Sequence, residues 1–491
     1  MTLNKKIIFD DGAKGFLILF LLSQFFLNNG IYLAVGFVCL MLIAYNLQQP
    51  FKPSVFTIIF IYHFLQVSAW IWLSNYLGKD INYKSLNSGN AVLSGYIGLF
   101  FIFIPIIYYQ NKIPSISKLN MQKHAHKLSI EKTFRVYVIS FFVTNSLAAI
   151  ALSISGLSQI IFSLINVKWF LFVLFGLQVL LKKKMKKEFY IFVAIEFFSG
   201  FFSYFSNFKT VLFFLAFLFM TFIVKIYLRQ VIISFLVIIA AFFLGVFWSN
   251  VKDEYRGFLN QGSKSQTVQV SRNEALNKLI ELSEKQDNSK FDEGVITFLD
   301  RIQYTYHIAK AMDYVPEKIP YQEGKNWGNS LEFALTPRLL NPNKPNYEAS
   351  SKATKYTGIS YAGAKQGVSV SLGYFADGYV DFGFVGMYFP LLVIGLIYGL
   401  SYFYFVKNSS NNFIFNYAVV AGMYMEFLAM EMDSTYLTGR LFSTLLAFFL
   451  LKIFFFPWLF NYIKEPVTSF YKKPQPGNAS TMSTQVGLKS P

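Results

Sequence analysis

Two cations in a proline-rich stretch have the residue types and spacing to bind phosphate. Arg338 directly follows Pro337, and Lys344 directly precedes Pro345. Proline restricts the backbone, so both side chains are expected to be held in fixed positions. Arginine and lysine are the usual partners of phosphate oxygens, and the tyrosines of this stretch offer faces for sugar rings. A proline-stiffened connector with incidental cations is the alternative interpretation.

A third cation, Arg301, lies on a predicted helix. A helix that starts near Asp292 and runs to Tyr314, before Pro316, would bury a seam through Val295 and place Arg301 at its border. An amphipathic helix is also predicted over 271–288. For Arg301, a surface ion pair with a nearby acid is the competing interpretation.

The composition indicates that the chain is a membrane protein. The chain of 491 residues is 54% hydrophobic, 19% aromatic and only 14% charged, which fits a bilayer as solvent. The single cysteine, Cys39, cannot form a disulfide within the chain, and the four histidines lack zinc-like spacing.

We predict an all-α polytopic membrane protein with about twelve transmembrane helices. The predicted spans are 15–27, 31–47, 54–77, 90–109, 134–152, 157–181, 189–206, 211–224, 231–248, 382–406, 413–430 and 441–463. Short loops between them carry lysines, above all Lys182–Lys187, which places these loops in the cytoplasm. Within the spans, Lys168 and Glu196 are a candidate buried pair.

This topology divides the chain into four parts. Helices one to nine occupy 1–249, a large periplasmic loop 250–381, helices ten to twelve 382–463, and a disordered cytoplasmic tail 464–491. The loop is expected to be mostly helical or irregular. It holds 16 basic and 16 acidic residues, so the formal charge of +18 comes from the rest of the chain. The basic residues outside the loop are therefore expected to face a membrane surface, and nucleic acid is not the expected partner.

Two stretches of the loop resemble motifs of one enzyme family. Gly324, Pro337-Arg338 and the later Lys344-Pro345 are similar to a motif of bacterial oligosaccharide repeat-unit polymerases, the Wzy-type O-antigen polymerases. Ala376–Gly383 looks like that family's Gly-Glu-Ala-Tyr-Leu-Asn-Phe-Gly segment. Asp377 stands where the family has Glu, and Asp381 where it has Asn.

The resemblance implies a membrane glycosyltransferase with a GT-C-like arrangement. A growing glycan on undecaprenyl pyrophosphate would be the donor and a single lipid-linked repeat unit the acceptor. Fixed cations would stabilise the leaving pyrophosphate without a metal or cofactor. The candidates for this role are Arg338, Arg301, Lys344, Arg440, Arg256 and Lys209.

A base would help the attacking hydroxyl. Asp377, Glu431, Glu348 and His307 are candidates, and structural pairing with a neighbouring cation is the alternative for each of them. Tyr379, in the second motif, is a candidate substrate contact.

The resemblance also implies a location and partners. We expect the inner membrane, with both termini cytoplasmic, lipid-linked glycans and membrane lipid as partners, and a chain-length regulator protein as a further candidate. An O-antigen ligase is the nearest alternative, but His307 lacks the glycine pattern expected after a ligase histidine. A flippase for lipid-linked sugars is the non-enzyme alternative, and it predicts inverted repeats that we do not find.

Overall fold

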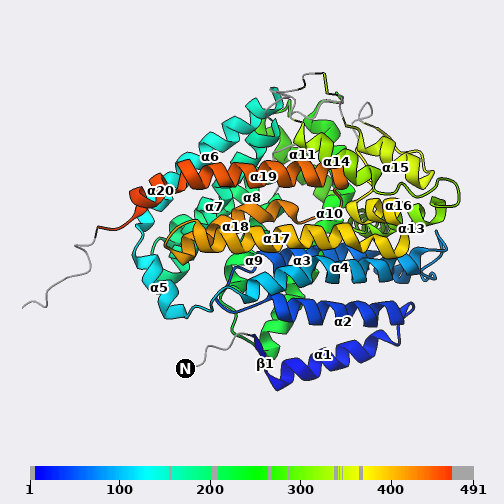
Figure 1. Ribbon diagram of the computed structural model, residues 1–491, viewed down its shortest axis with the longest axis horizontal. Helices are drawn as coiled ribbons and strands as arrows, with labels where there is room; N and C mark the ends of the chain where they lie inside the picture. Colours follow the sequence, from blue (N-terminus) through cyan, green and yellow to red (C-terminus); the bar gives the residue numbers. More distant parts are fainter. Residues whose placement is uncertain are drawn as a thin grey trace, which may run out of the picture.

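Helices make up nearly all of the architecture. The computed structural model describes residues 6–153, 158–201, 208–263, 268–285, 288–336, 341, 343–344, 347–363 and 369–466 (Figure 1). Over these residues it holds twenty α-helices, one 3-10 helix and two strands of two residues each.

Each apolar run expected to span the membrane overlaps a helix. These helices are α1 (Asp11–Gln24), α2 (Gly30–Leu47), α3 (Val55–Tyr76), α4 (Ser88–Asn111), α6 (Ile130–Ser153), α7 (Ser158–Lys182), α8 (Lys186–Phe201), α9 (Phe208–Met220), α10 (Leu228–Leu259), α17 (Tyr388–Asn408), α18 (Phe413–Tyr424) and α19 (Ser434–Phe454). Among the described residues, seven helices are long and apolar enough to cross a membrane: α2, α3, α4, α7, α10, α17 and α19. The chain is therefore an all-α membrane protein, and the count of about twelve spans stays a prediction.

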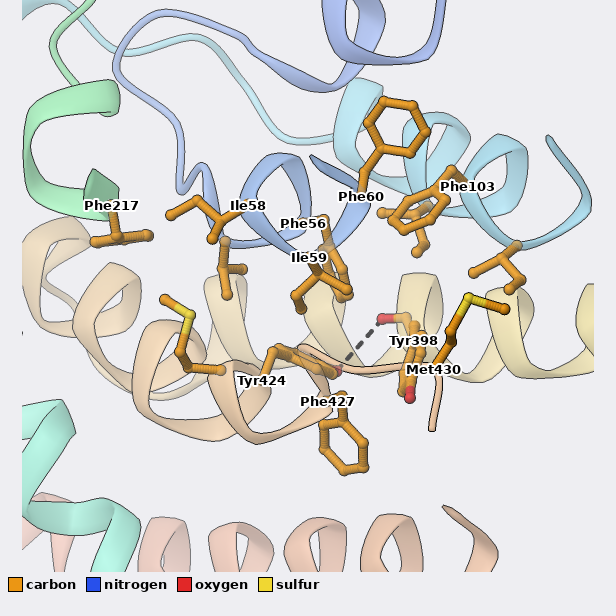
Figure 2. Packing of buried hydrophobic residues seen from close by; sticks show 14 of the residues in the cluster. Phe56, Ile58, Ile59, Phe60, Phe103, Phe217, Tyr398, Tyr424, Phe427 and Met430 are labelled. Carbon is orange, nitrogen blue, oxygen red and sulfur yellow. Dashed lines mark hydrogen bonds between the residues drawn. The ribbon is translucent and has the colours of Figure 1, made fainter. Parts of the chain in front are cut away.

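The core of the bundle is aromatic. α3 packs against α18, where the ring centroids of Phe56 and Tyr424 lie 4.7 Å apart, and against α4, where those of Phe60 and Phe103 lie 5.1 Å apart (Figure 2). α4 in turn packs against α17. Close helix approach depends on Gly395, because a Cβ there would lie 2.3 Å from the Ile102 carbonyl oxygen. Small residues allow such contacts between membrane helices.

The polar segment between α10 and α17 folds into short helices at one end of the bundle. These are α11 (Arg272–Glu284), α12 (Asn288–Ile302), α13 (Thr305–Tyr314), α14 (Lys325–Leu335), α15 (Ala349–Thr357) and α16 (Tyr374–Gly386) (Figure 1). We call this end the polar end. The amphipathic helix predicted over 271–288 is confirmed as α11, which Ser271 caps with Glu274 in a reciprocal capping box.

The single helix predicted from Asp292 to Tyr314 is wrong. The structure has two helices, α12 and α13, because the chain breaks where Tyr304 docks on α3 through a hydrogen bond from its backbone N to Gln66 O (3.0 Å). Asp292 is not a cap. It lies inside α12 and accepts a hydrogen bond from the Tyr76 hydroxyl over 2.5 Å.

The last predicted span, 441–463, also differs from the structure. α19 begins earlier, at Ser434, because the Asp433 carboxylate accepts hydrogen bonds from the backbone N of Thr435 and Tyr436, both at 3.0 Å. The chain then turns at Phe455 into α20 (Phe456–Ile463). The connection from α18 to α19 is therefore short, and it contains the 3-10 helix η2 (Met425–Phe427).

The end opposite the polar end carries basic segments. There α5 (Lys118–His126) and α20 lie far from α13, α15 and α16 (Figure 1). Strands β1 (Ile8–Phe9) and β2 (Lys225–Ile226) pair in parallel and tie the start of the chain to the turn before α10. This separation agrees with the expected distribution of lysines, and the sidedness itself stays a prediction.

Candidate functional site

α10 extends well beyond its apolar part. Its 32 residues are about 48 Å long, whereas the hydrocarbon layer is about 30 Å thick. The predicted span ends at Trp248, so the last turns of α10 project from it at the polar end. Lys252 and Arg256 lie there four residues apart, on one face of the helix.

α12 and α9 bring two more cations to these last turns. α12 packs beside α10, where Asn250 Nδ2 donates to Lys290 O over 2.7 Å, and Arg301 Nη2 donates to Asp253 Oδ1 over 3.3 Å. Lys209, in the first turn of α9, interacts electrostatically with Lys252. We call Lys209, Lys252, Arg256 and Arg301 the cation cluster.

Lys252 is the half-buried centre of the cluster. Burial, together with the repulsion of Arg256, Arg301 and Lys209, lowers the pKa of Lys252 to about 8, against the attraction of Asp253. The fold thus holds like charges together at an energetic cost, and a bound anion would relieve that cost.

Glu431 faces the cluster from the connection between η2 and α19. It accepts a hydrogen bond from Gln66 Nε2 over 3.1 Å and interacts with Lys209 and Lys252. Burial raises the pKa of Glu431, and the two lysines partly offset that rise. More than a third of the surface of Glu431 is accessible.

Arg440 lies in the second turn of α19. Its guanidinium interacts electrostatically with Glu426 in η2, and the Thr444 hydroxyl donates to the Glu426 carboxylate. Glu426 and Glu431 belong to one short connection. Of the cations predicted from the sequence, Lys209 interacts with Glu431 and Arg440 with Glu426, whereas Arg256 and Arg301 interact with Lys252.

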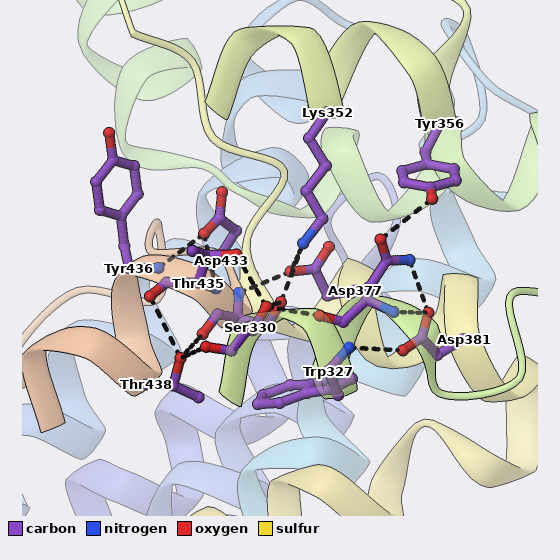
Figure 3. Close-up of polar contacts among 12 residues, drawn as sticks. Trp327, Ser330, Lys352, Tyr356, Asp377, Asp381, Asp433, Thr435, Tyr436 and Thr438 are labelled. Atoms are coloured by element: carbon purple, nitrogen blue, oxygen red, sulfur yellow. Dashed lines mark hydrogen bonds and ion pairs between the residues drawn. The ribbon is translucent and has the colours of Figure 1, made fainter. Parts of the chain in front are cut away.

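Asp377 lies elsewhere, in a buried network beside α14. Lys352 Nζ lies 2.7 Å from Asp377 Oδ2, and the Ser434 backbone N donates to the same oxygen over 2.7 Å (Figure 3). Lys352 also donates to the Ser434 hydroxyl over 3.0 Å. Asp377 is fully buried, so in this structure it fastens α15, α16 and α19 together.

Asp381, a residue of α16, stabilises the start of α14. Its carboxylate accepts hydrogen bonds from the backbone N of Trp327 (3.0 Å) and from the backbone N and side chain of Asn326 (3.3 and 2.7 Å) (Figure 3). An acid in this place caps a helix and complements its dipole.

Tyr379 and His307 are both packed into protein. The Tyr379 hydroxyl donates to Val315 O over 2.9 Å. His307 Nδ1 lies 3.2 Å from the Tyr361 hydroxyl, and burial lowers the pKa of His307 to about 4. The histidine is therefore neutral at pH 7.

The motif cations are placed only in part. Arg338 lies outside the described residues. Lys344 Nζ donates to the carbonyl oxygens of Phe333 and Thr336, the latter over 2.8 Å, at the end of α14. It thus satisfies carbonyls that the helix leaves without an internal partner. Glu348 accepts a hydrogen bond from Ser351 Oγ over 3.0 Å.

Residues 96–457 match the family of a domain of unknown function (DUF8712). The chain belongs to the DUF8712 family. No curated protein and no solved structure matches the chain.

The DUF8712 region contains the whole cation cluster, Glu426, Glu431 and Arg440. Gln66, which holds Glu431, lies before it. In the described part of the chain, no three His, Cys, Asp or Glu side chains are grouped as metal ligands would be.

Sequence reasoning missed Lys252 and Lys352. Lys252 could have been found, because it shares a helical face with Arg256 just beyond a predicted span. Lys352 could not, because only the tertiary fold brings it to Asp377.

Proposed function

We propose that this DUF8712 protein is a membrane glycosyltransferase that polymerises undecaprenyl-pyrophosphate-linked repeat units at the outer face of a bacterial inner membrane. The cation cluster, in which Lys209 and Lys252 interact with Glu431, carries the proposal. The motif resemblance in 324–345 and 376–383 supports it.

In the proposed reaction a hydroxyl oxygen of the acceptor sugar attacks the anomeric carbon of the donor glycan. The bond from that carbon to the pyrophosphate oxygen breaks, and the lipid pyrophosphate leaves with the electron pair. Breaking this bond adds one negative charge to the two that the diphosphate ester already carries, so the leaving group has three negative charges. The cation cluster would stabilise them, and one such contact is worth about 3 kcal/mol in the transition state.

Glu431 is our candidate for the base that accepts the hydroxyl proton. Its raised pKa makes the carboxylate a stronger base than an ordinary glutamate, which suits work near neutral pH. Lys209 and Lys252 lie close enough to interact with it, so the base and two of the phosphate-binding charges are neighbours. Asp377, with its own buried lysine, is assigned a structural role in this proposal.

Reconstitution tests the proposal. Purified protein in vesicles, given a defined undecaprenyl-pyrophosphate-linked repeat unit, is expected to produce a ladder of longer glycans. Glu431→Gln should reduce the rate at least about 100-fold, as loss of a positioned base does. Lys318→Ala is the matched control, since Lys318 is an exposed lysine of the same loop paired with Glu317 (3.1 Å). A wild-type protein that makes no ladder, but carries the lipid-linked unit across the vesicle membrane, would identify a flippase instead.

A further inference from the structure

We infer that α14 is a membrane-surface helix that inserts Leu331 and Leu335 into the outer layer of the phospholipid bilayer. The inference concerns a segment of the loop that the sequence predicts to lie in water. It does not depend on the proposed enzymatic activity.

α14 has three distinct faces. One faces the protein: Ser330 is buried, and its hydroxyl lies 2.8 Å from the hydroxyls of both Ser434 and Thr435. A second face is polar and exposed, formed by Lys325, Asn329 and Glu332. The third is apolar and exposed, with Leu331 and Leu335 one turn apart and 52% and 61% accessible. A helix that touches protein, water and lipid at once needs three such faces.

The contacts of α14 fix its depth. Ser330 meets the first turn of α19, and Thr438 Oγ1 in the next turn donates to Ser330 O over 3.2 Å. α19 is one of the helices long and apolar enough to cross a membrane. A helix packed against its first two turns lies at the level where that span enters the bilayer.

The apolar surface of the bundle continues onto the start of α14. On α17, a second candidate span, Phe389 is 65% exposed, and its ring centroid lies 6.5 Å from that of Phe382 in α16. The Phe382 ring in turn lies against Gly324, where a Cβ would be 3.2 Å from it. Val385, in the same turn as Phe382, is 82% exposed. Lipid that covers α17 therefore reaches Gly324, which lies on the same side of the helix as Leu331 and Leu335.

Site-directed fluorescence tests the inference in the full-length protein. The only cysteine, Cys39, is buried, so a Cys39→Ala background allows single labels. A bimane label is placed through Leu331→Cys, through Asn329→Cys on the polar face as the matched control, and through Val393→Cys on α17 as the lipid-facing reference. The variants are reconstituted in vesicles of phosphatidylcholine and phosphatidylglycerol, with or without brominated phosphatidylcholine.

The label at position 331 should be quenched by brominated lipid about twofold, like the label at position 393, and should resist aqueous iodide. The label at position 329 should show the reverse. Quenching of the label at 331 by iodide alone would overturn the inference, because that face would then lie in water. Protection from both quenchers would also overturn it, because protein would then cover the face. Gel filtration of each variant separates these outcomes from misfolding.

Discussion

Arg301 Nη2 lies 3.3 Å from Asp253 Oδ1, and this contact joins α12 to the projecting turns of α10. Asp253 also lies near Lys252, so one exposed acid serves two cations of the cluster. The balance of charge at this place stays positive. That excess is the feature on which the account of function depends.

Removal of Arg301 should weaken the reaction and leave the fold intact. Arg301 is 39% accessible at its side chain, so its surface ion pair contributes little to stability. Arg301→Ala should lower kcat/KM about 100-fold through lost stabilisation of the leaving group, whereas the thermal midpoint should hardly change. Steady-state kinetics and thermal unfolding measure the two effects. Arg301→Ala with unchanged kcat/KM would remove this residue from the site.

The activity should fall on the alkaline side as Lys252 loses its proton. Because the pKa of Lys252 is lowered to about 8, this side chain is protonated below that pH in the free enzyme and loses its positive charge above it. kcat/KM should therefore decline as the pH rises through about 8. Lys252→Arg should move the decline to higher pH, since arginine stays charged. An alkaline limb at the same pH in that variant would argue against Lys252 as its source.

The acid limb should come from Glu431. A base must be ionised, so kcat/KM should rise with pH through the pKa of Glu431, which burial raises above the usual range for glutamate. Glu431→Gln should abolish the limb along with most of the activity. A limb that persists in the residual activity of Glu431→Gln would assign the base elsewhere.

Lys352 should matter for stability. Asp377 is fully buried and depends on Lys352, whose Nζ lies 2.7 Å away. Lys352→Ala would leave a buried carboxylate without its cation, which should lower the free energy of unfolding by about 3–5 kcal/mol. The double variant Lys352→Met/Asp377→Asn removes both charges and should recover much of the loss. Denaturation in detergent compares the three proteins, and equal stability of Lys352→Ala and wild type would contradict the assignment.

Loss of the Asp381 carboxylate should destabilise α14 and leave other helices unchanged. Asp381→Ala removes the acceptor for the backbone N of Asn326 and Trp327, at a cost of about 1 kcal/mol. Hydrogen exchange should become faster in 325–335 and stay unchanged in α11. Asp292→Ala, which removes a contact to Tyr76, is the control and should leave α14 protected.

The sequence predicted those features that follow from local pattern. Apolar runs located the helices of the bundle, and the pair expected between Lys168 and Glu196 is confirmed, with Nζ 2.9 Å from Oε2. The helices follow from hydropathy, and the ion pair follows because a charge inside a membrane protein needs a partner.

What the sequence could not reveal depends on contacts between distant segments. The break between α12 and α13 arises because Tyr304 binds Gln66, more than two hundred residues earlier. The motif makes Asp377 a candidate base, and only the fold shows that it is paired with Lys352. Likewise, Glu431 is distinguished from other acids only by the lysines that the fold brings to it.

Binding of undecaprenyl pyrophosphate to the purified protein tests the central claim most directly. The account predicts that the double variant Lys252→Gln/Arg301→Gln binds it at least about 100-fold more weakly than wild type, and that Lys318→Gln binds it normally. Equal affinity of the double variant and the wild type would contradict the claim that the cation cluster holds the pyrophosphate.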